Sequence, residues 1–169
     1  MKSWSDIRKT LEQDRLAPSL RGRVQYYITR YREAHDDHGR VAIRVDGKEV
    51  FKSSIFDVFK LEQEIEHRMD EQYPGLTGRD RWSKENEQLI TEGAASEHAF
   101  YYAFREYDTQ SIEQSLESEY ALVRVLAILD RRVGKRRLAA IKERGFDGEP
   151  EWVQFFYRLR LEAEGLLCE

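Results

Sequence analysis

The residue types best suited to hold a charged ligand are concentrated in one short part of this chain. Its five cations are Arg131, Arg132, Lys135, Arg136 and Arg137. We call residues 131–137 the basic stretch. Clustered guanidinium and ammonium groups bind a phosphate, an acidic protein partner or the protein's own carboxylates with the same hydrogen-bonding chemistry. Pairing with Asp130 and with the acidic middle of the chain therefore competes with binding to a partner.

A helix that starts beside the basic stretch would strengthen its attraction for anions. The apolar stripe of the preceding segment ends at Leu129, and Gly134 favours a break before a second helix that begins with Lys135. The first backbone N–H groups of a helix and its dipole add to the positive charge of nearby side chains. The sequence indicates a partner- or anion-binding surface here, and we assign it no catalytic residue.

A second candidate surface combines aromatic rings with cations. Its members are Arg21, Arg23, Tyr27, Tyr31 and Arg44. From Arg23 the hydrophobic pattern has period two, so Tyr27 and Tyr31 share one face of a strand, and Arg44 lies outward on the neighbouring strand. Rings interleaved with cations on an open sheet can stack on bases and hold phosphates. An ordinary sheet face packed against helices competes, and the net acidity of the chain argues against tight unspecific binding of nucleic acid.

The segment His35-Asp36-Asp37-His38 resembles a metal site because imidazole and carboxylate groups adjoin in it. Four consecutive side chains cannot all converge on one ion, and the sequence has no HExxH, EF-hand loop or second His/Cys cluster. A polar hairpin loop is the favoured interpretation. GxSxG, Walker and GxGxxG motifs are also absent, so we assign no metal, no cofactor and no catalytic residue.

Charge is segregated along the chain, whose net charge is −4. Residues 1–52 hold 12 basic and 8 acidic side chains, residues 53–119 hold 6 and 16, and residues 120–169 hold 10 and 8. The basic ends can dock on the acidic middle or leave opposed patches for partners.

Targeting and redox signals are sparse. No run of about 18 apolar residues is present, and the N-terminus is charged where a signal peptide would be apolar. The single cysteine, Cys168, allows no intramolecular disulfide. We therefore expect a cytoplasmic protein that is not embedded in a membrane.

A short helix and a meander form the predicted N-terminal part. A capping box at Ser3 and Asp6 opens a helix that ends before Pro18. Alternation of period two then predicts three antiparallel strands, at residues 23–31, 41–45 and 48–51. Asp46-Gly47 predicts a type I′ turn between the last two strands, because both central residues of that turn need a positive φ.

Helices account for the rest of the chain. A capping box at Ser54 and Asp57 opens the first, which ends at Pro74-Gly75, and Ser83 caps the next. That helix is predicted at 83–93. The remaining helices are predicted at 96–107, 111–117, 119–130, 134–144 and from Pro150 onward. The loop at Gly75 divides the chain into a helix/meander/helix subdomain, 1–74, and a helical subdomain, 75–169, which could also form one compact domain.

In the last helix, aromatic and aliphatic side chains recur at the spacing of a core-facing stripe. They are Trp152, Phe155, Phe156 and Leu159. Burial in the core is the favoured interpretation, and a groove for a partner is the alternative.

Three stretches of the chain resemble a family of small uncharacterised bacterial proteins that combine the same motifs. They are Pro18-Ser19-Leu20-Arg21-Gly22-Arg23-Val24, Val45-Asp46-Gly47-Lys48-Glu49-Val50 and Leu129 to Leu138, which we call the first, second and third motifs. The resemblance spans most of the chain, and the acidic middle is its least distinctive part. It implies a bacterial cytosolic protein and carries over no catalytic residue, since that family has no established activity.

These observations predict an α+β protein with an N-terminal helix, a three-stranded antiparallel meander and a mainly α-helical C-terminal region. The function we expect first is non-catalytic binding of an unknown protein partner through the basic stretch. An RNA-binding module that uses the Arg/Tyr sheet face and the basic helix is the alternative, and an enzyme of unknown class is the third hypothesis.

Overall fold

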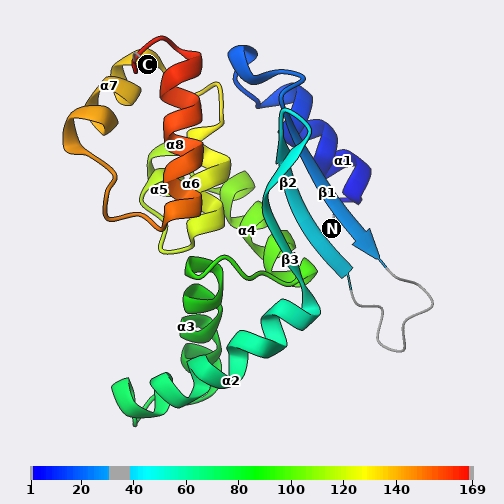
Figure 1. Ribbon diagram of the computed structural model, residues 1–169, viewed down its shortest axis with the longest axis vertical. Helices are drawn as coiled ribbons and strands as arrows, with labels where there is room; N and C mark the ends of the chain where they lie inside the picture. Colours follow the sequence, from blue (N-terminus) through cyan, green and yellow to red (C-terminus); the bar gives the residue numbers. More distant parts are fainter. Residues whose placement is uncertain (1, 31–38, 168–169) are drawn as a thin grey trace.

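The computed structural model describes residues 2–30 and 39–167 and shows an α+β protein, as the sequence predicts (Figure 1). Its sheet has three antiparallel strands in the order β1-β2-β3. The strands are β1 (Val24–Arg30), β2 (Gly39–Val45) and β3 (Lys48–Ser54). The prediction of a polar loop at residues 35–38 and the role expected for Tyr31 fall outside the described residues.

The turn between β2 and β3 has the predicted type I′ character. Asp46 and Gly47 both adopt positive φ, at 50° and 79°. Val45 pairs with Lys48 across this two-residue turn, and the register shifts between Ile43 and Arg44. The turn therefore places the residues of the second motif at the end of the sheet.

Residues 2–20 pack along the edge of the sheet and form a brace for strand β1 (Figure 1). The elements are α1 (Trp4–Lys9), a π-helical turn η1 (Thr10–Asp14) and a 3₁₀ turn η2 (Pro18–Leu20). The capping box at Ser3 and Asp6 is present. Glu12 Oε1 accepts a hydrogen bond of 2.8 Å from the backbone N–H of Tyr26, so this brace satisfies a donor of edge strand β1.

The C-terminal helices are α4 (Glu97–Thr109), α5 (Ile112–Leu116), α6 (Ala121–Ile128), α7 (Lys135–Arg144) and α8 (Glu151–Ala163). Helices α4 and α8 lie beside one face of the sheet, and α6 lies behind α8 (Figure 1). Tyr26 is buried against Phe100 of α4, with ring centroids 6.2 Å apart. Phe51 of β3 lies 4.7 Å from the ring of Trp152 on α8. One hydrophobic core therefore joins the sheet to the late helices.

Helices α2 (Ile55–Gln72) and α3 (Gly78–Thr91) form an arm that extends away from the rest of the molecule (Figure 1). The arm has its own small apolar cluster, which includes Ile65, Met69 and Leu89. The capping box at Ser54 and Asp57 opens α2 as predicted. The division of the chain at residues 74 and 75, between these two helices, stays a prediction.

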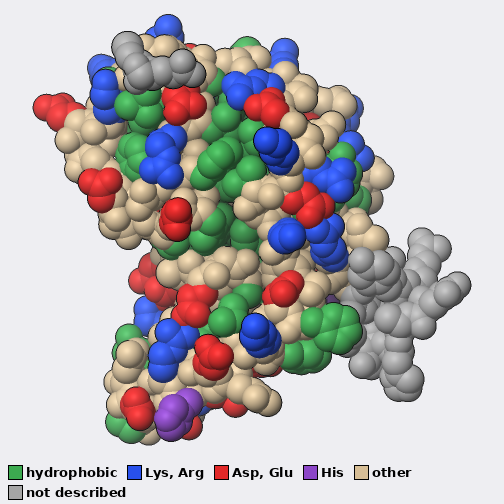
Figure 2. Space-filling view, viewed as in Figure 1, with side chains coloured by type: hydrophobic (Ala, Val, Ile, Leu, Met, Phe, Trp, Pro, Cys, Tyr) green, Lys and Arg blue, Asp and Glu red, His purple; other side chains and the backbone are tan. Residues whose placement is uncertain are grey.

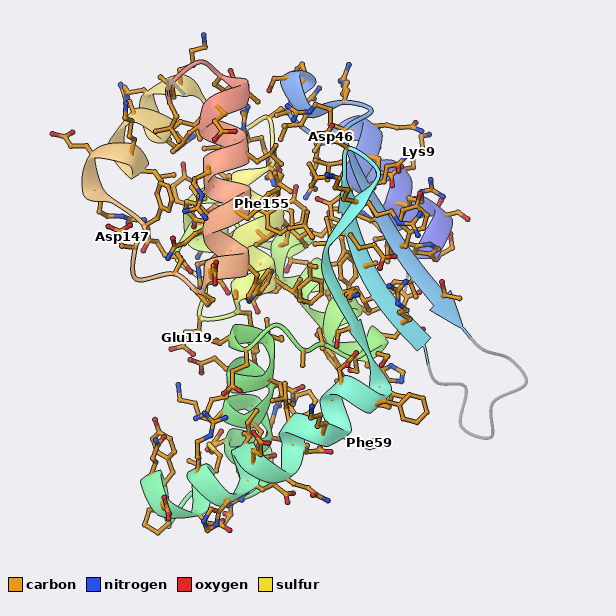
Figure 3. All side chains as sticks on the ribbon, viewed as in Figure 1. Lys9, Asp46, Phe59, Glu119, Asp147 and Phe155 are labelled. Atoms are coloured by element: carbon orange, nitrogen blue, oxygen red, sulfur yellow. The ribbon has the colours of Figure 1, made fainter. Side chains whose placement is uncertain are left out.

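Two local predictions were wrong. Ser83 does not cap α3, because the helix begins at Gly78 after Thr77 and Ser83 lies inside it. The Ser83 hydroxyl lies 2.7 Å from that of Tyr120. Phe155 does not belong to the buried stripe of α8, since it is 36% exposed while Phe156 is fully buried. Phe155 faces the solvent beside the sheet (Figure 3), where Figure 2 shows hydrophobic side chains at the surface of the body. The core face of α8 is rotated toward Val153, Tyr157 and Leu161 instead.

Candidate functional surface

The basic stretch follows the most buried helix of the protein. Every residue of α6 except Arg124 is buried, and burial continues through Leu129 and Asp130. The chain then turns outward, and α7 begins at Lys135 as predicted. A charged residue at the end of an apolar helix must find partners for its carboxylate, because an unpaired buried charge is costly.

The Asp130 carboxylate accepts hydrogen bonds from three groups: the Arg132 guanidinium, the Arg132 backbone N–H and the Tyr107 hydroxyl. Its Oδ2 accepts hydrogen bonds of 2.9 and 2.7 Å from Nε and Nη2 of Arg132, and its Oδ1 accepts one of 2.7 Å from the Arg132 backbone N–H. The hydroxyl of buried Tyr107 also donates to Oδ2. Burial, and then the negative charge of Asp130, raise the pKa of Tyr107, so the phenol stays protonated as a donor. Arg132 is thus a structural residue of the loop.

Arg137 is likewise engaged within the protein. Its Nη2 forms an ion pair with Glu113 of α5, and its Nη1 donates to the backbone carbonyl of Arg132 at 3.1 Å. For Arg132 and Arg137, the competing interpretation of intramolecular pairing therefore describes the structure.

Arg131, Lys135 and Arg136 differ from these two residues. All three side chains are exposed, and none forms an ion pair with any residue in 2–30 or 39–167. The backbone N–H of Arg131 donates to the carbonyl of Arg15 at 2.7 Å. We call these three residues the exposed cations. No side chain caps the N-terminus of α7 at Gly134, so its first N–H groups add positive potential beside them.

Buried Arg160, which no sequence motif singled out, fixes the loop between α6 and α7. Its Nη2 donates to the carbonyl of Val133 at 3.0 Å, and its Nη1 contacts Ser19 Oγ at 3.2 Å and pairs with Glu164. Burial would raise the pKa of Glu164, yet it is lowered, because Ser19 and Arg160 donate to the carboxylate and Lys135 lies near it. The Arg160–Glu164 spacing of four residues on α8 was the available signal.

Contacts made by Arg160 and Arg23 bring the three motifs together. Through Ser19 and Val133, Arg160 links the first motif to the third. Arg23 of the first motif forms a bidentate pair with Asp46 of the second, at 3.0 and 2.8 Å. Figure 3 shows Asp46 at the same end of the molecule as the C-terminal end of α8. We call this end, with its three motifs, the motif end.

In the second candidate surface, Arg44 and Tyr27 contact each other and neighbouring residues of the same sheet face. The guanidinium of Arg44 lies 4.2 Å from the centroid of the Tyr27 ring, and that of Arg8 lies 5.6 Å from it. Arg44 also pairs with Glu49, which Arg40 contacts as well. Hydrogen bonding from Arg40, together with Arg44, lowers the pKa of Glu49 to about 2. Tyr27 and Arg44 are therefore partners of one another, and Arg23 belongs to the motif end.

The last member of that surface, Arg21, lies outside the sheet. It follows η2 and is exposed, and its Nη2 makes a long contact of 3.5 Å with the carbonyl of Gln13. The structure therefore does not gather Arg21, Arg23, Tyr27 and Arg44 into one open face for stacking bases.

The fold and the motif end define an α+β protein in which a small meander shares one hydrophobic core with a helical body, and in which buried Arg160 links the first motif to the third. The chain belongs to the SF0329 protein family, which matches residues 3–161. This is an uncharacterised family, in keeping with the kind of family that the three motifs resemble. No curated protein and no solved structure matched the chain.

Two further findings concern metals and membranes. In the part of the chain that the structure describes, no group of three or more His, Cys, Asp or Glu side chains is placed to hold a metal ion. No helix within residues 2–30 and 39–167 combines the length and the apolar character that a membrane span requires.

Proposed function

We propose that this protein is a non-catalytic interaction module that binds an acidic protein partner through Arg131, Lys135 and Arg136. The observation that carries the proposal is the contrast within the basic stretch. Arg132 and Arg137 are paired within the fold, while the three exposed cations form no ion pair with a described residue. Cations left exposed in this way can pair with carboxylates of another chain.

The framework below the exposed cations supports the same proposal. Asp130 and Arg160 fix the backbone on both sides of the loop, through Arg132 N–H at 2.7 Å and the Val133 carbonyl at 3.0 Å. A loop that is ordered before binding loses less conformational entropy when a partner arrives. Exposed charges at such a surface speed association and exclude partners of the same charge. The proposal places the protein in the bacterial cytoplasm, as its resemblance implies.

Capture from bacterial lysate with three forms of the protein tests the proposal. The test form carries Arg131→Gln, Lys135→Gln and Arg136→Gln, and the control form carries the same change of charge at exposed Lys9, Lys52 and Lys60. Circular dichroism first verifies that all three forms fold. Each capture is done with and without nuclease, and retained proteins are identified by mass spectrometry.

We expect a protein that the wild type and the control form retain, that the test form loses, and that survives nuclease. The purified partner should then bind the wild type directly and more weakly at higher salt, since the contact is between charges. Equal retention by all three forms would refute the role of the exposed cations. Retention that nuclease abolishes would replace the protein partner with a nucleic acid.

A further inference from the structure

Between α3 and α4 lies a pocket of about 330 Å³ whose lining includes no residue of the three motifs. Its walls include Arg79 and Trp82 on α3, Tyr102 and Arg105 on α4, and Tyr120 in the turn before α6. This volume is at the lower end of the range for small-molecule sites. The pocket lies where the arm meets the rest of the molecule, next to the contact between α3 and the late helices (Figure 1).

Two large aromatic rings of the pocket remain in solvent. Trp82 is 51% exposed and Tyr102 is 56% exposed. Their ring centroids are 5.8 Å apart, and the planes meet edge to face at 74°. Each ring keeps a free apolar surface, so a planar ligand could stack on one ring and contact the edge of the other.

Two cations of the pocket lack partners in an acidic part of the chain. Residues 53–119 hold 16 acidic and 6 basic side chains, and Arg68, Arg81 and Lys84 all form ion pairs there. Arg79 and Arg105 form neither an ion pair nor a side-chain hydrogen bond with any residue that the structure describes. Guanidinium groups that form no ion pair with a described residue are available for an anionic ligand.

The remaining polar groups of the pocket are held in place. The hydroxyls of Ser83 and Tyr120 lie 2.7 Å apart. Glu106, which also lines the pocket, accepts a hydrogen bond of 2.5 Å from Ser118 through Oε1, and its Oε2 can accept a second one. The pocket thus offers rings for stacking, cations for an anion, and a carboxylate for a ligand N–H or O–H donor.

We propose that this pocket binds a mononucleotide, a planar base that carries one phosphate. A nucleobase provides the flat ring and an amino or imino donor for Glu106. A phosphate has enough oxygens for both guanidiniums of Arg79 and Arg105, whereas a single carboxylate has two. The site is independent of the exposed cations, so it stands or falls separately from the proposed partner binding.

Titration calorimetry with AMP, GMP, CMP and UMP tests the proposal, with adenosine and inorganic phosphate as the two halves of a ligand. Tyr102 and Arg105 also line a neighbouring hollow, so the diagnostic variants are Arg79→Gln and Trp82→Leu. Lys60→Gln is the matched control, because it removes one exposed positive charge from the arm outside the pocket. All three positions are on the surface, and circular dichroism verifies folding.

We expect at least one mononucleotide to bind with a Kd below about 1 mM, and adenosine and phosphate each to bind at least about tenfold more weakly. Each diagnostic variant should weaken nucleotide binding by about fivefold or more, while Lys60→Gln leaves it unchanged. The proposal is overturned if no nucleotide binds at about 5 mM. Binding that resists both diagnostic variants, or adenosine binding as tight as that of AMP, would overturn it as well.

Discussion

The basic stretch and the outer sheet face contain similar side chains but differ in how many of them the fold satisfies. On the sheet, Arg44 lies opposite Glu49 across the β2–β3 ladder and also contacts the Tyr27 ring. In the basic stretch, Arg132 and Arg137 reach carboxylates, while Arg131 and Arg136 do not reach any in the described part of the chain. Residue type alone therefore does not distinguish a structural cation from one that is available to a partner.

The geometry of the two regions explains this difference. In an antiparallel ladder each outward side chain has a cross-strand neighbour about 5 Å away, so a cation can be paired by the residue opposite it. A loop that leads into a helix has no such ladder. Its cations pair either with a carboxylate of the same loop, as Arg132 does with Asp130, or with one that the tertiary fold brings near, as Arg137 does with Glu113. Four predictions test this contrast, in order of decreasing effect.

The largest effect is expected at Asp130. Asp130→Ala should lower the free energy of unfolding by about 3 kcal/mol, because it leaves the Tyr107 hydroxyl and Arg132 without their buried acceptor. Urea denaturation measures the change. Exposed Asp147 provides the matched control, and Asp147→Ala should cost less than about 0.5 kcal/mol. Equal losses for the two variants would contradict a structural role for Asp130.

Adjacent arginines should differ in their contribution to stability. Arg132→Gln should cost about 1–2 kcal/mol, since it removes two hydrogen bonds to a buried carboxylate from a side chain that is still partly solvated. Arg131→Gln should cost less than about 0.5 kcal/mol, because its exposed side chain forms no ion pair with a described residue and the substitution keeps its backbone hydrogen bond. Thermal and urea unfolding of the two variants measure this difference. If Arg131→Gln proves the more destabilising, the contrast within the basic stretch is wrong.

On the sheet face, acid should weaken the fold through Glu49. Its pKa is about 2 in the folded protein and 4.5 ordinarily, so its stabilising contribution is complete above about pH 4.5 and is lost as the pH falls toward about 2. Urea midpoints measured at about pH 6 and about pH 3 should therefore fall less in Glu49→Gln than in the wild type. Parallel falls in the two proteins would show that the ion pairs of Glu49 contribute nothing to folding.

The smallest effect is expected from the stack of Arg44 on Tyr27. A double-mutant cycle of Tyr27→Leu and Arg44→Gln should give a coupling energy of about 0.5–1 kcal/mol, as expected for a cation near a partly exposed ring. The cycle is read from urea unfolding of the four proteins. A coupling energy of zero would mean that the ring and the cation are neighbours without attraction, and that Tyr27 is open to other partners.

Local pattern in the sequence was sufficient for most of the fold. Four local features were predicted and are present: the capping boxes at Ser3 and Ser54, the Asp46-Gly47 turn, and the start of α7 after Gly134. Each depends on hydrogen bonds or backbone angles of residues within a few positions of one another. Ser83 was the exception, because α3 begins at Gly78 and Ser83 lies inside the helix, where its hydroxyl contacts that of Tyr120, 37 residues away.

The composition of the basic stretch could be read from the sequence, and so could the hydrophobic periodicity of the helices on either side of it. Both are properties of residues that are close together in the chain. Which cations remain exposed was decided only by tertiary structure. Arg137 meets Glu113 across 24 residues, and Arg160 meets Ser19 across 141. Ion pairs act over only a few ångströms, so a charge finds its partner only after the core has assembled and set the distances between helices.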